Sequence, residues 1–195
     1  METLTGFKFI GDRIKHFEEA GEANFLFGYE ESCGYLTGTF VRDKDGVIAS
    51  FLIAEMTAYY KEKGLNLLQV LEQIQQRVGY HRDELLTVEL EDISEAGRHV
   101  DAFKHLPREF AGRLITEKRD YELGKGWKPL SKKEFNLTLP RSPVLHYTLD
   151  DDSWFAVRPS GTEPKVKFYL SVCAATAVEA DQKMAILHEA VLKKS

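Results

Sequence analysis

The stretch from Ser153 to Val172 most constrains the fold of this chain, because it predicts two strands joined by a short loop. Residues 153–157 are rich in aromatic and β-branched side chains, and residues 165–172 alternate between apolar and polar ones. Both patterns are typical of strands in a sheet. Pro159 and Pro164 favour an extended backbone in the residue before each of them. We therefore expect two strands here, with residues 158–165 as the connection.

The connecting loop has the composition of an anion-binding site. Ser160, Gly161 and Thr162 offer two hydroxyls, free backbone N–H groups and a glycine that permits close approach. Arg158 adds a planar guanidinium and Lys167 a point charge, a combination that suits a phosphate dianion. The residues by themselves equally allow an ordinary tight hairpin with a charged rim.

The second half of the chain predicts an antiparallel sheet with helices on one face, an α+β arrangement. Besides the two strands above, we expect strands at residues 86–90, 113–116 and 144–149, with a long polar loop over 118–133. Ser94 is expected to cap one helix, and Thr176 with Glu179 forms a capping box for the last one. The polar composition near Gly79 predicts a linker, which divides the chain into residues 1–79 and 80–195.

The first half predicts part of an α/β layer. We expect a helix that ends near Gly21, a buried strand at 24–27, a loop at 28–34, a buried helix at 47–63 and a helix capped by Asn66. One strand cannot form a sheet, so its partners must lie upstream or in another molecule. An exposed apolar face at that place predicts poor solubility or self-association.

Glu30 and Ser32 are the candidate polar site of this half. Alternation along an extended segment places them on one side and Glu31 on the other. A carboxylate beside a hydroxyl is a good acceptor set for vicinal sugar hydroxyls. The two glutamates are also compatible with acid–base or metal chemistry, or with a solvated loop.

Charge and cysteine content narrow the class of protein. The net charge of -5 argues against a nucleic-acid partner. The histidines show no metal-ligand spacing and Asp150–Asp152 lacks the other ligands of a calcium loop, so we expect no metal site. Cys33 and Cys173 are too few for a disulfide framework, and the apolar run 47–56 is too short for a bilayer. We expect a cytoplasmic protein with no membrane partner.

Several stretches, in order over nearly the whole chain, are similar to one known family. They are Thr5–Lys8, Gly28–Gly34, Val41–Gly46, Glu117–Tyr121, Leu139–Leu145 and Arg158–Tyr169. They resemble the α-D-phosphohexomutase superfamily, the phosphoglucomutases and phosphomannomutases. Within that family, Gly28–Gly34 resembles the sugar-binding loop of the third domain and Arg158–Tyr169 the phosphate-binding loop of the fourth.

The resemblance implies an enzyme of four domains that moves a phosphoryl group between positions 1 and 6 of a hexose phosphate, or 1 and 5 of a pentose phosphate. It implies a phosphoserine in the first domain, Mg²⁺ on an aspartate-rich loop of the second, and a sugar 1,6-bisphosphate as intermediate and activator. The residues that would hold sugar hydroxyls are Glu30 and Ser32. Those that would clamp the phosphate that is not reacting are Arg158, Ser160, Gly161 and Thr162. The supporting cations would be Lys167, Lys8 and Arg42.

The chain departs from the family pattern because it has neither the serine loop nor the aspartate-rich metal loop. We therefore expect the C-terminal part of such an enzyme, with a phosphorylated sugar and the missing N-terminal domains as partners, and no catalytic residue or turnover of its own. The sugar-binding loop has Tyr29 between Gly28 and Glu30. In this respect it resembles the phosphoglucomutase and phosphopentomutase branches more than the phosphomannomutase branch. A phosphomannomutase or phosphopentomutase fragment and a stand-alone phosphosugar-binding module remain alternatives.

Overall fold

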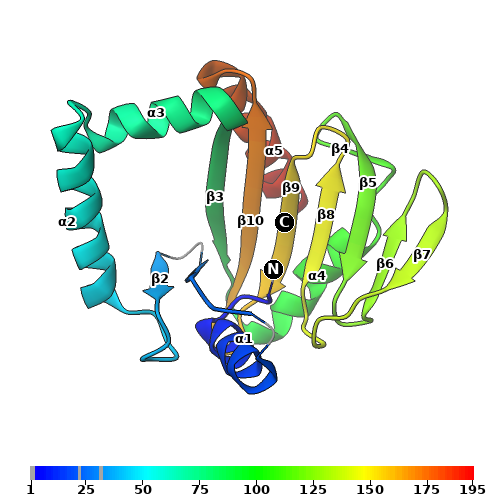
Figure 1. Cartoon of the computed structure of the whole chain (residues 1–195). Coiled ribbons are helices and arrows are strands. Elements are labelled where there is room, and N and C mark those ends of the chain that lie inside the picture. Colours follow the sequence, from blue (N-terminus) through cyan, green and yellow to red (C-terminus); the bar gives the residue numbers. More distant parts are fainter. Residues whose placement is uncertain (1–2, 22, 31–32) are drawn as a thin grey trace. The chain divides into compact units, whose positions relative to one another are not determined.

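The computed structural model describes residues 3–21, 23–30 and 33–195. The chain forms two compact units, residues 1–73 and 74–195, each with its own sheet (Figure 1). The division falls inside helix α3 (Leu67–Val78), a few residues before the predicted linker. Among the described residues, no helix is long and apolar enough to cross a membrane.

The second unit is built on an eight-stranded antiparallel sheet. Its strands are β3 (Tyr80–Glu89), β4 (Glu109–Phe110), β5 (Arg113–Asp120), β6 (Lys125–Lys128), β7 (Lys133–Asn136), β8 (Leu145–Leu149), β9 (Trp154–Pro159) and β10 (Lys165–Ala174). They lie in the order β3-β10-β9-β8-β5-β6-β7, and β4 pairs with β5 off this path. The two strands predicted around the loop are therefore β9 and β10, which are antiparallel neighbours inside the sheet.

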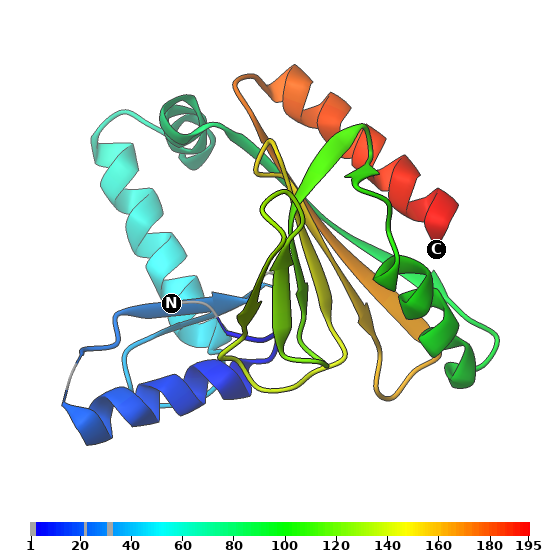
Figure 2. The ribbon, with the colours of Figure 1, turned by 90° about the vertical axis from the view of Figure 1, so that its right-hand side faces the viewer.

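Two helices, α4 (Ala96–Lys104) and α5 (Ala177–Lys194), cover one face of this sheet (Figure 2). The 3-10 turn η1 (Ile93–Glu95) precedes α4. Phe103 of α4 and Leu187 of α5 are buried in one apolar cluster with Phe155, Val157 and Phe168 of the sheet. Alternate residues of β9 and β10 therefore point into this core, and the residues between them lie on the opposite face.

Two side chains of the sheet bond to the C-terminal end of α4. The Tyr147 hydroxyl donates to the Phe103 carbonyl, and the Lys118 ammonium donates to the Lys104 carbonyl at 2.6 Å. The last carbonyls of a helix have no partner inside the helix, so these bonds satisfy groups that would otherwise be orphaned. Burial lowers the pKa of Lys118 and raises that of Tyr147. Helix α4 is thus held on the sheet by these two hydrogen bonds as well as by apolar contacts.

The predicted helix caps are confirmed at two of three positions. Thr176 Oγ1 accepts from the Glu179 N–H at 3.3 Å, and Asn66 exchanges two bonds with Gln69 at 2.9 Å. The prediction for Ser94 is wrong, because Ser94 lies inside the turn η1, where the Asp92 carboxylate is the cap and accepts from the Ser94 N–H at 2.8 Å. Helix α4 follows this turn from Glu95, whose side chain makes no cap bond. Asp92 and Ser94 are both suitable caps, and the sequence does not choose between residues two positions apart.

The predicted polar loop over 118–133 is also wrong, because this segment contains the end of β5, all of β6 and the turn to β7. Its strands are held by cross-strand contacts rather than by an apolar face. Trp127 Nε1 donates to Glu134 at 3.1 Å, and Lys125 pairs with the same carboxylate. A Cβ on Gly126 would lie 2.3 Å from the Phe135 ring, so the ring lies over the glycine. Such strands lack the alternation that identifies a buried strand.

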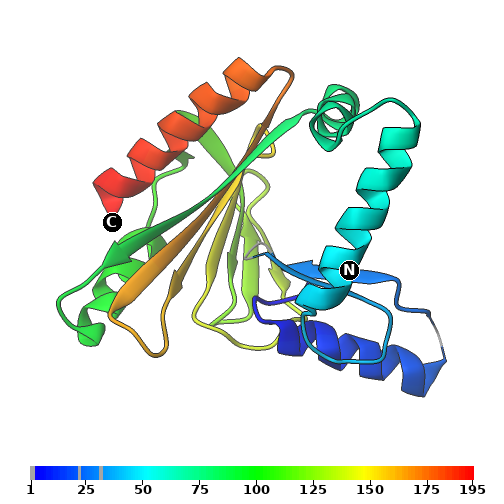
Figure 3. The same ribbon diagram turned by 90° about the vertical axis from the view of Figure 1, so that its left-hand side faces the viewer.

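The first unit contains α1 (Phe7–Ala20), the hairpin β1 (Phe27–Glu30) and β2 (Gly34–Thr37), α2 (Gly46–Glu62) and the beginning of α3. Helix α1 lies alongside the hairpin (Figure 3) and ends at Gly21, which has a left-handed conformation. The core of this unit is small: Phe7, Ile14 and Leu36 form its buried cluster.

Two predictions for this unit need correction. The strand expected at 24–27 is β1, which begins at Phe27 and pairs with β2, and Phe27 is exposed rather than buried. The helix expected to be buried is α2, in which no residue is buried. Both predictions rested on apolar composition, which is typical of elements inside an α/β layer. The described part of the unit has only a two-stranded sheet, which is too small to cover them.

Candidate functional site

The loop between β9 and β10 is held by its own backbone. The Ser160 N–H donates to the Lys165 carbonyl at 2.8 Å and closes the hairpin. Ser160 Oγ accepts from the N–H groups of Glu163 at 3.2 Å and Thr162 at 3.4 Å. The Leu90 N–H, just after β3, donates to the Pro164 carbonyl at 2.8 Å. These bonds fix the loop in one conformation, so little ordering remains to be done when a ligand binds.

Two cations lie side by side at the base of this loop, one on each of the strands that it joins. Arg158 of β9 and Lys167 of β10 are directly opposite in register, on the face away from the core. Neither side chain forms an ion pair with any residue that the structure describes. Like charges in directly opposed positions destabilise a sheet by about 0.2–1 kcal/mol. An anion placed between them would remove this repulsion.

The tip of the loop is open. A Cβ added to Gly161 would meet no atom within 4 Å, so packing within the protein does not require a glycine there. The Ser160 oxygen is already an acceptor, which leaves its proton free to donate. Lys165, in contrast, is engaged by Glu163 at 3.4 Å and Glu89 at 3.5 Å. One end of the hairpin β9–β10 thus carries the four residues predicted to clamp phosphate and one of the predicted supporting cations: Arg158, Ser160, Gly161 and Thr162, with Lys167.

In the first unit, the Glu30 carboxylate is buried and paired. Its side chain is 7% exposed and lies 3.4 Å from the Lys44 ammonium. Gly34 is its register partner, and a Cβ there would lie 3.1 Å from Glu30 Oε2 and 2.8 Å from Lys44 Cδ. A buried carboxylate is costly unless it is paired, so Lys44 explains why Glu30 is tolerated. Glu31 and Ser32 lie outside the described residues.

The other predicted cations of this unit do not contact Glu30. Arg42 forms an ion pair with Glu18 and donates to the Thr39 carbonyl at 2.9 Å. Lys8 is exposed at the start of α1, where its ammonium lies 5.1 Å from the centre of the Phe9 ring. The sequence reasoning missed Lys44, which lies two positions after Arg42 in the stretch Val41–Gly46. The burial of Glu30, which the sequence does not reveal, was the signal needed to find it.

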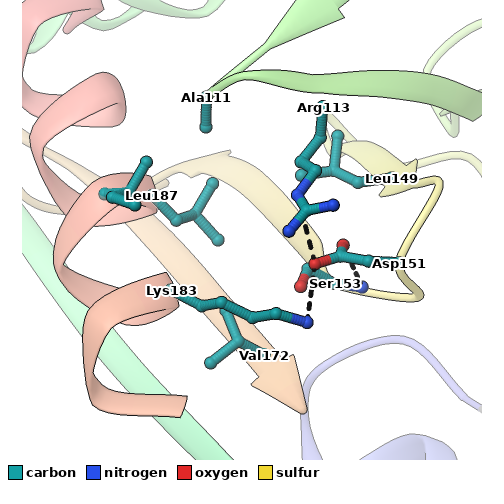
Figure 4. Close-up of a pocket in the computed structure, with 9 residues that line it drawn as sticks. Ala111, Arg113, Leu149, Asp151, Ser153, Val172, Lys183 and Leu187 are labelled. Carbon is teal, nitrogen blue, oxygen red and sulfur yellow. Dashed lines mark hydrogen bonds and ion pairs between the residues drawn. The ribbon is translucent and has the colours of Figure 1, made fainter. Parts of the chain in front are cut away.

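Asp151, in the Asp150–Asp152 turn, belongs to a small cluster of ion pairs. Asp151 pairs with Lys183 at 2.8 Å and Arg113 at 3.5 Å beside a pocket of about 40 Å³ (Figure 4). Burial opposes the charge of Asp151, but its hydrogen bond to Lys183 lowers the pKa overall. In the described part of the chain, no group of acidic, histidine or cysteine side chains could hold a metal ion.

Two stretches of this chain match two domains of one known protein family. Residues 1–78 match "Phosphoglucomutase/phosphomannomutase, alpha/beta/alpha domain III", and residues 144–189 match the C-terminal domain of the same family. The chain belongs to this family. Among phosphoglucomutase/phosphomannomutase proteins, the Homo sapiens "Glucose 1,6-bisphosphate synthase" is 36% identical over 199 residues, covering 99% of this chain and 31% of the relative. A Staphylococcus epidermidis "Phosphoglucomutase" is 35% identical over 175 residues, covering 88% of this chain and 32% of the relative.

A solved structure has the same fold as this chain. The crystal structure of pp63/parafusin, a phosphoglucomutase from Paramecium in its open form, matches with a TM-score of 0.63 and 20% identity. The match covers 97% of this chain and 32% of the Paramecium chain. The chain thus spans about a third of the length of the relatives it matches. The predicted family and the predicted fold class, part of an α/β domain III followed by an antiparallel C-terminal domain, are confirmed.

Proposed function

We propose that this chain supplies the sugar- and phosphate-binding sites of a phosphoglucomutase-like enzyme. The observation that carries the proposal is the pair of cations Arg158 and Lys167, which pair with no acid among the described residues and lie beside a loop held by its own backbone. A guanidinium and an ammonium in adjacent positions suit a phosphate dianion. Glu30, already neutralised by Lys44, would accept hydrogen bonds from sugar hydroxyls.

The reaction that we propose for the longer enzyme is the interconversion of sugar 1-phosphate and 6-phosphate through a sugar 1,6-bisphosphate. The phosphate held at Arg158 is the one that does not react. Its binding energy would position the other phosphate, because interactions remote from the reacting atoms orient a substrate. We assign Mg²⁺ and the phosphoserine to the N-terminal domains, as the resemblance to the family implies. A cytoplasmic location stays a prediction.

Calorimetry tests the binding role with the 195-residue chain. Glucose 1-phosphate and inorganic phosphate should both bind, and Arg158→Ala should weaken both. Arg98→Ala is a matched control, because Arg98 is an exposed arginine on α4, and α4 covers the face of the sheet opposite to the Arg158 and Lys167 side chains. Equal affinities of the native chain and Arg158→Ala would refute the assignment.

The absence of turnover is tested separately. With glucose 1-phosphate, glucose 1,6-bisphosphate and Mg²⁺, the chain should form no glucose 6-phosphate, since no phosphoserine loop is present in the sequence. Turnover by the purified chain above the rate of a blank preparation would contradict this.

A second candidate is the synthesis of a sugar bisphosphate, since two relatives of 36% identity are named "Glucose 1,6-bisphosphate synthase". Mannose or pentose phosphates are alternative substrates, and a stand-alone phosphosugar-binding module is an alternative role. Assays of the gene's full-length product would separate these by the product formed, a monophosphate or a bisphosphate, and by the preferred sugar 1-phosphate.

A further inference from the structure

The loop between β9 and β10 carries a carboxylate of its own. Glu163 lies in the same short turn as Ser160, since its N–H donates to Ser160 Oγ at 3.2 Å. The Glu163 side chain is 54% exposed, so its charge stays beside the loop rather than being buried elsewhere. Charges closer than the Debye length, about 8 Å at physiological ionic strength, are not fully screened. A loop that binds an anion therefore needs a positive charge that offsets Glu163.

Lys165 is the cation that pairs with this carboxylate. Its ammonium lies 3.4 Å from Glu163 Oε1 and 3.5 Å from Oε1 of Glu89, the last residue of β3. The hydrogen bond to Glu163 is the largest cause of a raised pKa of Lys165, so the ammonium stays charged. Exposed ion pairs of this kind contribute little to stability. Stability alone therefore does not explain why three charges are gathered at this point.

Lys165 lies on the same face of the sheet as Lys167. The two lysines are separated in β10 by Val166, which is fully buried, so their side chains point away from the core about 7 Å apart. On the other side, the Ser160 N–H donates to the Lys165 carbonyl at 2.8 Å, which places Ser160 opposite Lys165. Lys165 is thus next to the site proposed for phosphate, but its ammonium is occupied by two acids.

We propose that Lys165 is a positioning residue of the phosphate site, which neutralises the carboxylate of Glu163 and does not itself bind the phosphate. The inference rests on the proposed function, since it gives Lys165 a role only if the loop binds phosphate. The contact with Glu89 holds the ammonium toward β3, on the side of β10 away from Arg158 of β9. A phosphate then meets the charges of Arg158 and Lys167, while that of Glu163 is already offset.

Calorimetry of the 195-residue chain with inorganic phosphate tests the inference. Lys165→Met should raise the dissociation constant by about 5- to 10-fold at low salt, because a unit charge roughly 7 Å from a dianion is lost. Glu163→Gln should lower the dissociation constant by about two- to fivefold, for the opposite reason. The double variant, Lys165→Met with Glu163→Gln, has no carboxylate left to offset and should bind within about threefold of the native chain.

Three further measurements separate this role from a structural one. Each change of affinity should shrink in high salt, since it acts through the charge. Lys165→Arg keeps the charge and should retain the native affinity. The urea midpoints of all these variants should match that of the native chain, as expected for exposed ion pairs.

The pair of Lys193 and Glu189 provides the matched control. Their side chains lie 2.6 Å apart on α5, which covers the opposite face of the sheet. Lys193→Met and Glu189→Gln make the same changes of net charge far from the loop, so they should leave the dissociation constant unchanged within about twofold.

Two results would overturn the inference and leave the proposed function standing. If Lys165→Met binds phosphate as tightly as the native chain, Glu163 needs no offsetting charge. If Lys165→Met loses affinity and Glu163→Gln does not restore it, Lys165 is a direct ligand of the phosphate instead. A native chain that binds no phosphate would overturn the proposed function, and this inference with it.

Discussion

Replacing Arg158 by alanine should stabilise the free chain and weaken its binding of phosphate. In the free chain, Arg158 and Lys167 are directly opposed like charges, and the structure describes no acid paired with either of them. Such a pair costs about 0.2–1 kcal/mol. Removing one member should therefore raise the free energy of unfolding by a few tenths of a kcal/mol or more. When phosphate is bound, the same guanidinium attracts the phosphate, so its removal should weaken binding.

The expected loss of binding is larger than this gain in stability. A hydrogen bond to a charged group contributes about 1.5–3 kcal/mol, which corresponds to a dissociation constant raised by about 10- to 150-fold. Lys167→Ala should produce the same two effects, with a smaller loss of affinity because an ammonium does not bind in bidentate fashion. In the double variant, the second substitution should add no further stability to the free chain, since the repulsion has already been removed.

Urea unfolding with and without phosphate, combined with calorimetry, measures both quantities. Arg158→Gln keeps most of the side chain and separates the loss of charge from the loss of packing. High salt should reduce the stability gain, because the repulsion of half-exposed charges is screened. The reasoning is refuted if Arg158→Gln destabilises the free chain by more than about 1 kcal/mol, or if its affinity for phosphate equals that of the native chain.

Three further predictions concern other buried polar groups. Glu30→Gln should change the preference between glucose 1-phosphate and inorganic phosphate while leaving phosphate affinity intact; calorimetry that shows equal losses for both ligands would contradict it. Lys118→Met should lower the free energy of unfolding by about 1–3 kcal/mol, because the Lys104 carbonyl loses its donor, and unchanged urea unfolding would contradict it. Burial, followed by the nearby Arg119, lowers the pKa of His146 from 6.5 to about 4. Because the unfolded chain takes up this proton first, the contribution of His146 to stability should be fully present well above pH 6.5 and should decrease by about 3 kcal/mol toward pH 4. His146→Gln should remove that part of the pH dependence, and an unchanged difference between pH 7 and pH 4 would contradict the assignment.

The central strands of the second unit were predictable because local pattern and tertiary environment agree there. Residues 165–172 alternate, and Val166, Phe168, Leu170 and Val172 are buried in the structure. The Thr176–Glu179 cap was predictable for the same reason, since both partners lie within one turn. Where the information needed is local, the sequence is sufficient.

The predictions from sequence are wrong where the structure of a segment depends on a contact with a distant residue, or on a contact that the described residues do not supply. Strand β6 is held by Trp127 and Lys125 through Glu134 on the next strand, a pairing with no apolar periodicity. Helix α2 has the composition of a buried helix, yet none of its residues is buried. The Glu30–Lys44 pair joins the last residue of β1 to a residue before α2, and a lysine near a turn gives no sign that it will meet a buried carboxylate. The division of the chain between residues 1–79 and 80–195 and the roles of the site residues remain predictions.

The pairing of β10 with β3 has a consequence for the order in which the site can form. These two strands are the first and the last of the second unit, and they pair along ten residues, from Lys165 with Glu89 to Ala174 with Tyr80. Contacts between residues so far apart in sequence close a large loop, and folds dominated by them form slowly. During synthesis, β3 leaves the ribosome long before its partner and must wait with an unpaired edge. The loop of Ser160 is anchored to the end of β3 through Leu90, so it acquires its final shape only after nearly the whole unit has been made.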